Sequence, residues 1–184
     1  MIGRKQAATH EDFVRALRTI TQTVPRATYD VLVERTVAAI KRKIGTPDKV
    51  AYAWSGGKDS IALRAVCEKA GIKQCVFGMT NHLEYQAFLA WVTDNMPSGL
   101  TVLKNGWDLT WLATHQAMLF PQDATTAGKW FKGIQHSAQE RYYADKSLRM
   151  ILLGRRRSDG NFCGRNGDNI YESKGIVRFS PISD

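Results

Sequence analysis

The front of the chain carries apolar residues at helical spacing. In the first stretch they are Phe13, Leu17, Ile20 and Val24, and in the second they are Tyr29, Leu32, Val33, Thr36, Val37 and Ile40. This pattern predicts helices over residues 10–24 and 28–44, and Thr9 and Pro25 are a suitable cap and end for the first helix. We therefore expect residues 1–46 to form a helical extension that packs on the main domain or on a partner.

From residue 49 onward, short apolar runs alternate with helical segments. The predicted strands cover residues 49–54, 74–79, 100–103 and 149–153. The predicted helices cover residues 60–70, 84–95, 107–118 and 127–145, and short strand-like pieces follow at 169–171 and 176–179. Such alternation is typical of an α/β fold, a parallel twisted sheet with helices on both faces, and we assign residues 47–184 to one such domain. In these sheets ligands bind beyond the carboxyl ends of the strands.

A glycine-rich loop follows the first predicted strand and leads into a helix; its sequence is Ser55-Gly56-Gly57-Lys58-Asp59-Ser60. Two consecutive glycines let the backbone take positive φ and approach a ligand closely. The first amides of a helix have no partner within it, and together with the helix dipole they favour a phosphate group. Lys58 adds positive charge. Asp59 could hold a magnesium ion beside phosphate oxygens, or it could cap the helix.

An arginine segment follows the fourth predicted strand; its sequence is Gly154-Arg155-Arg156-Arg157-Ser158-Asp159. Arginine binds phosphate or sulfate through two parallel hydrogen bonds. Together with Arg165, the three arginines predict an anion site at the same edge of the sheet as the glycine-rich loop. The alternative is a solvated basic loop.

In its strand-and-helix context, the glycine-rich loop resembles the PP-loop of the N-type ATP pyrophosphatases and their phosphoadenylyl-sulfate (PAPS) reductase relatives. It is not a Walker loop, which needs Gly-x-x-x-x-Gly-Lys-Ser/Thr. Residues 154–160 are similar to the family segment Gly-x-Arg-x-x-Glu-Ser, with Arg156 at the arginine, Asp159 at the acid and Gly160 in place of the final serine. Residues 175–184 are similar to the family segment Pro-Leu-x-Asp-Trp. The resemblance implies an adenine nucleotide alpha hydrolase-like, Rossmann-like fold.

The resemblance also implies an adenine-nucleotide site. Its binding residues would be Ser55, Gly56, Gly57, Lys58, Asp59, Ser60, Thr80, Gly154, Arg155, Arg156 and Arg157. Of these, Lys58, Asp59 and Arg156 would act in catalysis, and Asp59 would hold magnesium. The ligand would be ATP, or adenylyl sulfate or PAPS, and we expect no iron–sulfur cluster.

The chain departs from the family pattern at three places. Family members often carry Asp-Thr-Gly after the second strand, whereas Met79-Thr80-Asn81-His82 keeps only the threonine. The cysteine that reductases need near the C-terminus does not precede Asp184, and residues 125–132 hold no cysteine pair. The missing cysteines disfavour reductase chemistry, and the intact Lys58-Asp59 pair favours the ATP-using branch.

Several single residues carry a functional hypothesis beside a structural one. His82 could contact substrate, or it is a surface histidine. Lys129 and Lys132, on either side of Trp130, could form a surface for a nucleobase or a single strand, or they belong to a solvated helix face. Cys163 could carry a thiol in sulfur transfer, or it is a buried or free cysteine.

Composition and charge narrow the classes of function. The formal net charge of +9 favours anionic partners, either nucleotide or nucleic acid, although a solvated basic face would give the same balance. No apolar run approaches the ~18–20 residues of a membrane span, and the N-terminus lacks a signal peptide, so we expect a cytoplasmic protein. Three scattered cysteines argue against a disulfide framework or a metal site built from cysteines.

Three functions remain open from the sequence. The first is an ATP pyrophosphatase-type enzyme that adenylates a substrate and releases pyrophosphate, in nucleic-acid modification or sulfur transfer, with tRNA or DNA among the candidate substrates. The second is a PAPS reductase-like protein that binds sulfonucleotides. The third is a non-catalytic module that binds nucleotide or nucleic acid. A homodimer is a reasonable arrangement for any of them.

Overall fold

The computed structural model describes residues 9–119 and 123–184. The chain forms two compact units whose boundary, between Thr36 and Val37, falls inside helix α2 (Arg26–Ile44). We describe each unit by itself, and the predicted division at residues 46 and 47 stays a prediction.

The first unit contains α1 (His10–Thr23) and the first part of α2. Thr9 caps α1 as predicted, because its side chain accepts a hydrogen bond from the amide of Asp12. In return, the carboxylate of Asp12 accepts from the amide of Thr9, which completes a capping box. The start of the helical extension is therefore defined by its own sequence.

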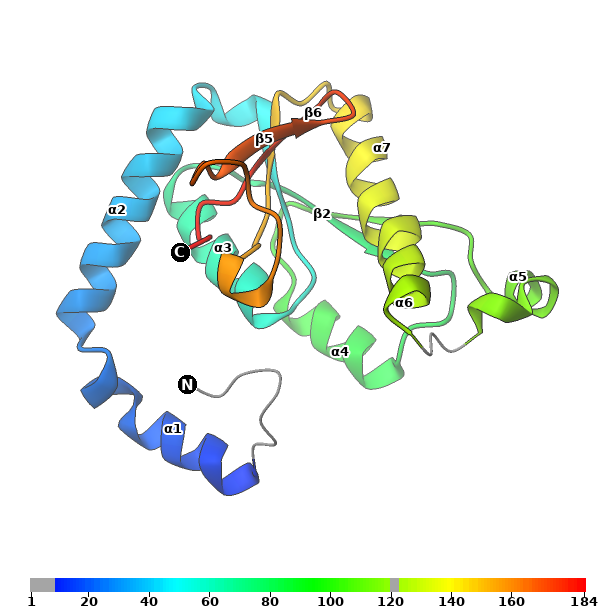
Figure 1. Cartoon of the computed structure of the whole chain (residues 1–184), viewed down its shortest axis with the longest axis horizontal. Coiled ribbons are helices and arrows are strands. Elements are labelled where there is room, and N and C mark those ends of the chain that lie inside the picture. Colours follow the sequence, from blue (N-terminus) through cyan, green and yellow to red (C-terminus); the bar gives the residue numbers. More distant parts are fainter. Residues whose placement is uncertain (1–8, 120–122) are drawn as a thin grey trace. The chain divides into compact units, whose positions relative to one another are not determined.

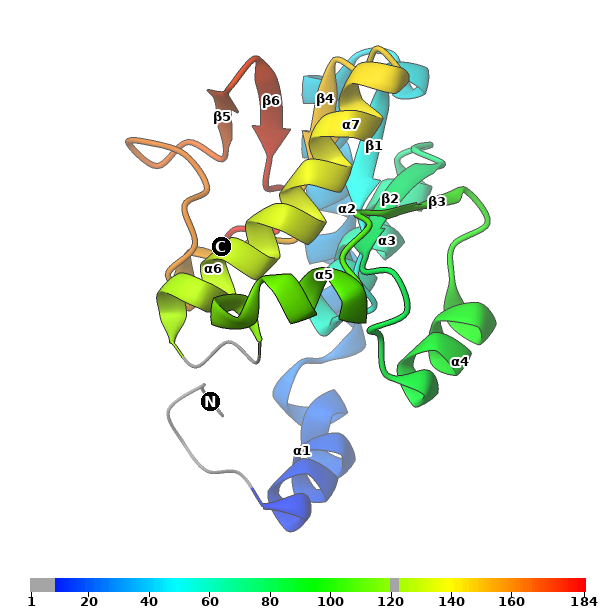
Figure 2. The same cartoon turned by 90° about the vertical axis from the view of Figure 1, so that its right-hand side faces the viewer.

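The second unit is built on a six-stranded sheet (Figures 1 and 2). Its strands are β1 (Val50–Ala53), β2 (Gln74–Met79), β3 (Leu100–Lys104), β4 (Met150–Leu152), β5 (Ile170–Ser173) and β6 (Ile176–Phe179). They lie in the order β3-β2-β1-β4-β6-β5, and neighbouring strands are parallel except for the antiparallel pair β5 and β6. The predicted α/β fold is confirmed, and the two last strands add a hairpin to its edge.

Helices connect the strands. They are α3 (Lys58–Lys69), α4 (Gln86–Asn95), α5 (Leu109–Thr114), α6 (Ala124–Phe131) and α7 (Ser137–Asp145), with short 3-10 turns η1 (Pro47–Lys49), η2 (Gln116–Met118) and η4 (Arg157–Asp159). The helix predicted over 107–118 is divided into α5 and η2, and the helix predicted over 127–145 is interrupted by a π-helical turn, η3 (Lys132–His136). Within the described ranges, no helix combines the length and the apolar character that crossing a membrane requires.

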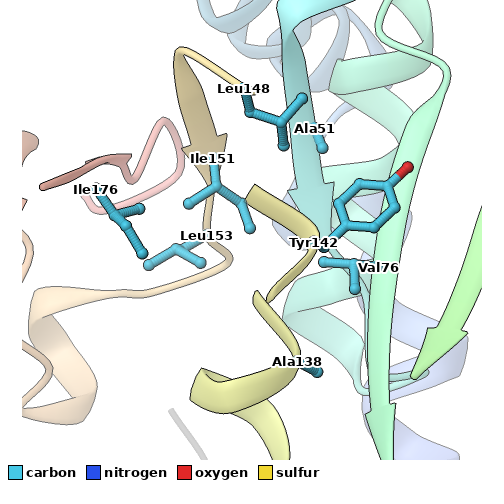
Figure 3. Packing of buried hydrophobic residues seen from close by; sticks show 8 residues of the cluster. All are labelled: Ala51, Val76, Ala138, Tyr142, Leu148, Ile151, Leu153 and Ile176. Atoms are coloured by element: carbon cyan, nitrogen blue, oxygen red, sulfur yellow. The ribbon is translucent and has the colours of Figure 1, made fainter. Parts of the chain in front are cut away.

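Helix α7 packs on one face of the sheet. Ala51, Val76 and Ile151 come from three adjacent strands and form a buried cluster with Ala138 and Tyr142 of the helix (Figure 3). Since successive residues of a strand point to opposite faces, the neighbours of these strand residues point away from α7.

Helix α3 covers the opposite face, where Tyr52 of β1 lies beside two cysteines. Burial raises the pKa of Cys67 in α3 well above its usual value and that of Cys75 in β2 to about 11. Both thiols are therefore protonated core residues, which is the ordinary role of a buried cysteine.

The π-helical turn η3 packs directly against β2. A side chain on Gly78 of β2 would collide with the carbonyl of Ile134, and Gln135 Nε2 donates a hydrogen bond to the Gly78 carbonyl at 2.8 Å. On the other side, a side chain on Gly133 would collide with the ring of Trp107. The two glycines therefore allow the turn to fit between the strand and the tryptophan.

Candidate functional site

The strand order creates a topological switch point between β1 and β4. The chain runs from β1 to β2 and β3 on one side, and it returns to β4 on the other side of β1. In sheets of this kind the ligand crevice lies at the carboxyl ends of the two strands at the switch point. The glycine-rich loop follows β1 and the arginine segment follows β4, so the fold brings both predicted segments to this place.

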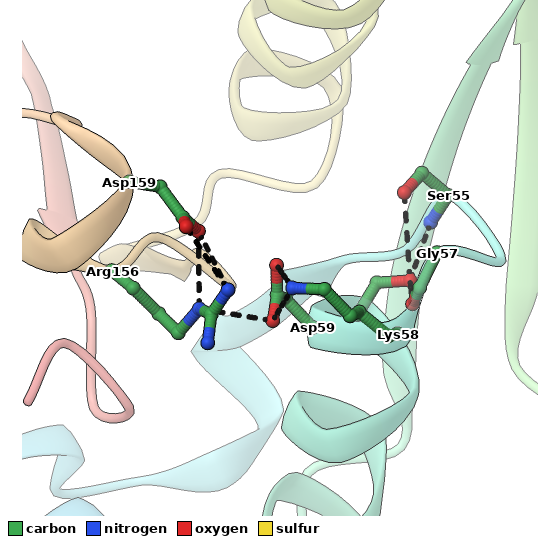
Figure 4. Close-up of polar contacts among 7 residues, drawn as sticks. Ser55, Gly57, Lys58, Asp59, Arg156 and Asp159 are labelled. Atoms are coloured by element: carbon green, nitrogen blue, oxygen red, sulfur yellow. Dashed lines mark hydrogen bonds and ion pairs between the residues drawn. The ribbon is translucent and has the colours of Figure 1, made fainter. Parts of the chain in front are cut away.

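The two segments are in contact (Figure 4). A Cβ atom on Gly154 would lie 3.0 Å from the carbonyl oxygen of Asp59, so glycine lets the chain pass the first turn of α3. Arg156 Nε lies 3.1 Å from Asp59 Oδ1, and the same guanidinium makes two hydrogen bonds to Asp159, at 3.1 and 3.0 Å. Lys58 Nζ hydrogen-bonds to both carboxylate oxygens of Asp59, at 3.0 and 3.1 Å. Two cations and two carboxylates thus form a network that is balanced in charge.

The loop is shaped by its own hydroxyl groups. Ser60 Oγ donates to the carbonyl of Gly57 at 2.8 Å and accepts from the amide of Ser55 at 3.2 Å. Gly57 is the N-cap residue of α3, and in the described part of the chain no side chain caps this helix, so Asp59 does not act as its cap. The first amides of α3 therefore remain available to an anionic ligand.

Aromatic side chains pack against the glycine-rich loop. Gly56 has φ of +73°, a conformation that favours glycine, and a Cβ atom there would lie 2.6 Å from the ring of Trp91. Trp54, the residue before the loop, is buried and stacks on Trp91 with ring centroids 6.0 Å apart. Glycine is therefore required at position 56 both by the positive φ of the backbone and by the ring of Trp91 next to it.

An aromatic pocket of about 330 Å³ begins at Ser55 and extends along β2. Its other lining residues are Phe77, Gly78, Glu84, Phe88, Trp130, Phe131, Ile134 and Gln135. Apolar walls with a few polar groups are typical of small-molecule sites, and flat rings favour a heteroaromatic ligand. Trp130 lines this pocket, whereas Lys129 is an exposed residue of α6.

Glu84 supplies an acid beside Thr80 that the sequence pattern did not reveal. Thr80 is buried, and its amide and its hydroxyl both donate to Glu84 Oε1 at 2.9 Å. The family pattern places an acid directly before the threonine, whereas here the acid comes from four residues later. The intervening turn includes His82, which is exposed and has φ of +67°.

Arg155 and Arg156 point in different directions. Arg156 has extended backbone, with φ −121° and ψ 141°, and consecutive side chains of an extended chain point to opposite sides. Arg156 reaches the glycine-rich loop, whereas Arg155 donates hydrogen bonds to the hydroxyl of Tyr171 at 2.7 Å and to Nε2 of His136 at 2.9 Å. The structure therefore does not gather the predicted arginines into one cluster.

Two other candidate residues, Arg157 and Cys163, make their contacts within the fold. Arg157 pairs with the carboxylate of Asp184 and donates to the carbonyl of Gly167 at 2.9 Å, so it ties the arginine segment to the C-terminal turn. Cys163 is buried, and its Sγ donates to the carbonyl of Asn161 at 3.6 Å.

The predicted magnesium ligand, Asp59, is engaged with Lys58 and Arg156. Across residues 9–119 and 123–184, no three His, Cys, Asp or Glu side chains gather as a ready-made metal site. Magnesium in nucleotide sites is usually bound by one or two carboxylates together with phosphate oxygens. Asp59 and Asp159, which share Arg156, fit that donor set when a nucleotide brings the remaining oxygens.

The strand order and the two loops at the switch point form an α/β fold, and comparisons with solved structures confirm that this fold resembles those of the predicted family. The structure is similar to that of phosphoadenylyl-sulfate (PAPS) reductase from Candida auris in a phosphate complex, with a TM-score of 0.55 and 13% identity over 96% of this chain and 81% of that one. It is also similar to FMN adenylyltransferase from Candida glabrata in complex with FMN and the ATP analogue AMPCPP, with a TM-score of 0.50 and 14% identity over 97% of this chain and 55% of that one.

Sequence comparison adds no closer relationship. No protein-family model matches the chain, and the search among curated proteins found no match. The structural similarities show the shared fold, and they give no support to a tRNA or DNA substrate or to a homodimer, which stay predictions.

Proposed function

We propose that the chain binds ATP with magnesium and transfers its adenylyl group to a substrate with release of pyrophosphate. The observation that carries this proposal is the uncapped start of α3, which faces the network of Lys58, Asp59, Arg156 and Asp159 at the switch point. The two solved neighbours, a PAPS reductase and an adenylyltransferase in complex with an ATP analogue, support a nucleotide as the ligand.

One nucleotide would span the aromatic pocket and the glycine-rich loop. Ser55 belongs to both, since it lines the pocket and its amide hydrogen-bonds to Ser60 within the loop. The adenine would lie among Phe77, Phe88 and Trp130, and the phosphates would bind the amides at the start of α3.

Binding of a triphosphate would exchange the partners of the charged network. The side chain of Lys58 is 73% exposed, so its ion pair with Asp59 is weak and easily replaced. Phosphate oxygens would take over Lys58 and Arg156, which leaves Asp59 and Asp159 free to hold magnesium. Bound there, the metal would offset the charge of the phosphates.

The residues of the site then assist a displacement at the α-phosphorus. An oxygen of the acceptor forms a bond to this atom, the bond to the bridging oxygen breaks, and pyrophosphate leaves with the electron pair. Amides of α3, Lys58 and Arg156 would hold the departing pyrophosphate and stabilise its developing charge.

Exchange of labelled pyrophosphate into ATP tests this reaction. We expect Lys58→Ala to lower the exchange rate on the order of 100-fold, because a cation at the leaving group is lost. Lys69→Ala is the matched control, since Lys69 is exposed at the other end of the same helix. An exchange rate that Lys58→Ala leaves unchanged would contradict the proposal.

Calorimetry separates the remaining functions. Binding of phosphoadenosine phosphate that is tighter than binding of ATP would favour a sulfonucleotide-binding protein. Salt-sensitive binding of RNA or DNA without ATP turnover would favour a non-catalytic module.

A further inference from the structure

A second and larger pocket lies beside the β5–β6 hairpin. This basic pocket has a volume of about 670 Å³, and its lining residues come from η3 and α7, from residues 155–168 and from the hairpin. Its lining has no residue in common with that of the aromatic pocket. The volume lies within the range of pockets that hold small molecules.

Cationic residues outnumber carboxylates in the lining of the basic pocket. Its five cationic residues are Lys132, Arg155, Arg165, Lys174 and Arg178, and they face three carboxylates. In a concave site with low-dielectric walls, such an excess raises the local concentration of anions. The pocket therefore differs from the glycine-rich loop, where cations and carboxylates are equal in number.

Arg178 is the most buried of these cations, with 4% of its surface exposed. Its Nη1 donates to the carbonyl of Ser173 at 2.8 Å, whereas its Nη2 lies 3.9 Å from Glu140 Oε1, which is too far for a hydrogen bond. Lys174 Nζ lies 4.0 Å from the same oxygen, so one distant carboxylate faces two cations. A buried charge without a close counter-ion is costly, and an anion in the pocket would relieve this cost.

Arg155 is held by neutral partners. A guanidinium can only donate, so Nε2 of His136, 2.9 Å away, must accept with its lone pair and the imidazole is neutral. Burial, followed by the charges of Arg155 and Arg178, lowers the pKa of His136, in agreement with this assignment. Its remaining partner is the carbonyl of Phe162, at 3.4 Å, so in the described part of the chain the hydrogen bonds of Arg155 all go to neutral groups.

We propose that the basic pocket binds a small molecule that carries a carboxylate or phosphate group, and that Arg155 and Arg178 recognise this charge. Phe162 and Tyr171 pack edge to face, with ring centroids 4.8 Å apart, and give the body of the ligand an apolar wall. The site is separate from that of the nucleotide, and it does not depend on the proposed adenylyl transfer.

Isothermal titration with phenyl phosphate, benzoate and uncharged phenol tests the site, each with and without saturating ATP. We expect at least one of the two anions to bind, phenol not to bind, and ATP not to displace the bound anion. Arg155→Gln should weaken binding about ten-fold, because a charge-assisted hydrogen bond is lost. Lys132→Gln changes an exposed lining residue and should weaken binding about two-fold even if the arginine variant does not fold.

Arg141→Gln is the control, since Arg141 is exposed on α7 and does not line the pocket. Failure of both anions to bind, an equal loss in Arg141→Gln, or displacement by ATP would overturn the proposal. Binding of benzoate alone would assign a carboxylate ligand, and binding of phenyl phosphate alone a phosphate ligand. Binding of phenyl phosphate by a protein that does not bind ATP would refute the proposed function and leave the basic pocket in place.

Discussion

Arg155 and Arg156 are adjacent in the chain, yet Arg156 faces a region that is balanced in charge and Arg155 faces one with an excess of cations. Arg156 lies between two carboxylates, and Lys58 shares one of them. Arg155 lies between a phenol and a neutral imidazole, in a pocket where cations outnumber carboxylates. One region pairs each of its cations closely with a carboxylate, whereas in the other Arg178 and Lys174 share one carboxylate at 3.9 and 4.0 Å.

Exposure explains why both arrangements are tolerated. The side chain of Lys58 is 73% exposed, so its ion pair contributes about 0–1 kcal/mol and can be exchanged for phosphate. Arg178 is buried and cannot exchange its partners for water so easily. The network at the glycine-rich loop is suited to an anion that binds together with a metal cation, and the basic pocket is suited to an anion without one.

Asp59→Asn should have the largest effect. It removes one carboxylate from the network at the glycine-rich loop, so that cations are in excess there as they are in the basic pocket. We expect pyrophosphate exchange to fall on the order of 100-fold, since the carboxylate proposed to hold magnesium is lost. We also expect the affinity for pyrophosphate without magnesium to rise about ten-fold, because Lys58 and Arg156 lose a competing partner. Calorimetry in a chelating buffer measures this affinity. Asp94→Asn, an exposed change at the end of α4, is the control, and a fall in the metal-free affinity would refute the exchange of partners.

Gly56→Ala should disturb the glycine-rich loop and leave the basic pocket unchanged. The substitution combines a positive φ with a collision against Trp91, and we expect it to lower the free energy of unfolding by about 1–3 kcal/mol. Gly106→Ala has the same sign of φ, at +79°, with open space around its Cβ position, so it measures the backbone cost alone. Urea unfolding of both variants gives the contribution of the collision. Equal losses would show that Trp91 does not restrict the loop.

The smallest expected effect is on the pH dependence of stability, through His136 in the lining of the basic pocket. Burial lowers the pKa of His136 below 6.5 in the folded state, so below this pH the unfolded chain takes up a proton first. The stability should therefore be full above pH 6.5 and should fall as the pH drops from 6.5 toward the folded-state pKa. Arg155, Arg178 and Lys174 oppose protonation, and Glu140 favours it.

His136→Gln should remove this part of the pH dependence, which urea unfolding at about pH 7.5 and about pH 5.5 would measure. His10→Gln on α1 is the control, and it should keep the slope of the unchanged protein. A slope that His136→Gln leaves intact would show that another group is responsible.

Elements whose pattern lies within a short stretch of sequence were predicted correctly. The strand over residues 74–79 matches β2, and Thr9 caps α1 as its side chain suggested. The glycine-rich loop was predicted from chemistry that is complete within six residues. Its placement at the switch point followed from the alternation of strands and helices.

Features that depend on distant packing could not be predicted in this way. The turn η3 interrupts a segment that reads as one helix, because its geometry depends on Gly78 and Trp107, which lie far away in the chain. Glu84 was missed because a turn brings it back to Thr80. The division of Arg155 from Arg156 depends on extended backbone that a run of arginines does not reveal.

The π-helical turn also has a consequence for how the protein could be redesigned. Phe131, Ile134 and Gln135 line the aromatic pocket, whereas Lys132 and His136 line the basic pocket, so one stretch of helix is a common wall of both. Removing the extra residue of this turn would rotate every following side chain and would alter both linings together. The walls that the pockets do not share, such as α4 for the aromatic pocket and the β5–β6 hairpin for the basic pocket, are therefore the places where one lining can be changed without the other.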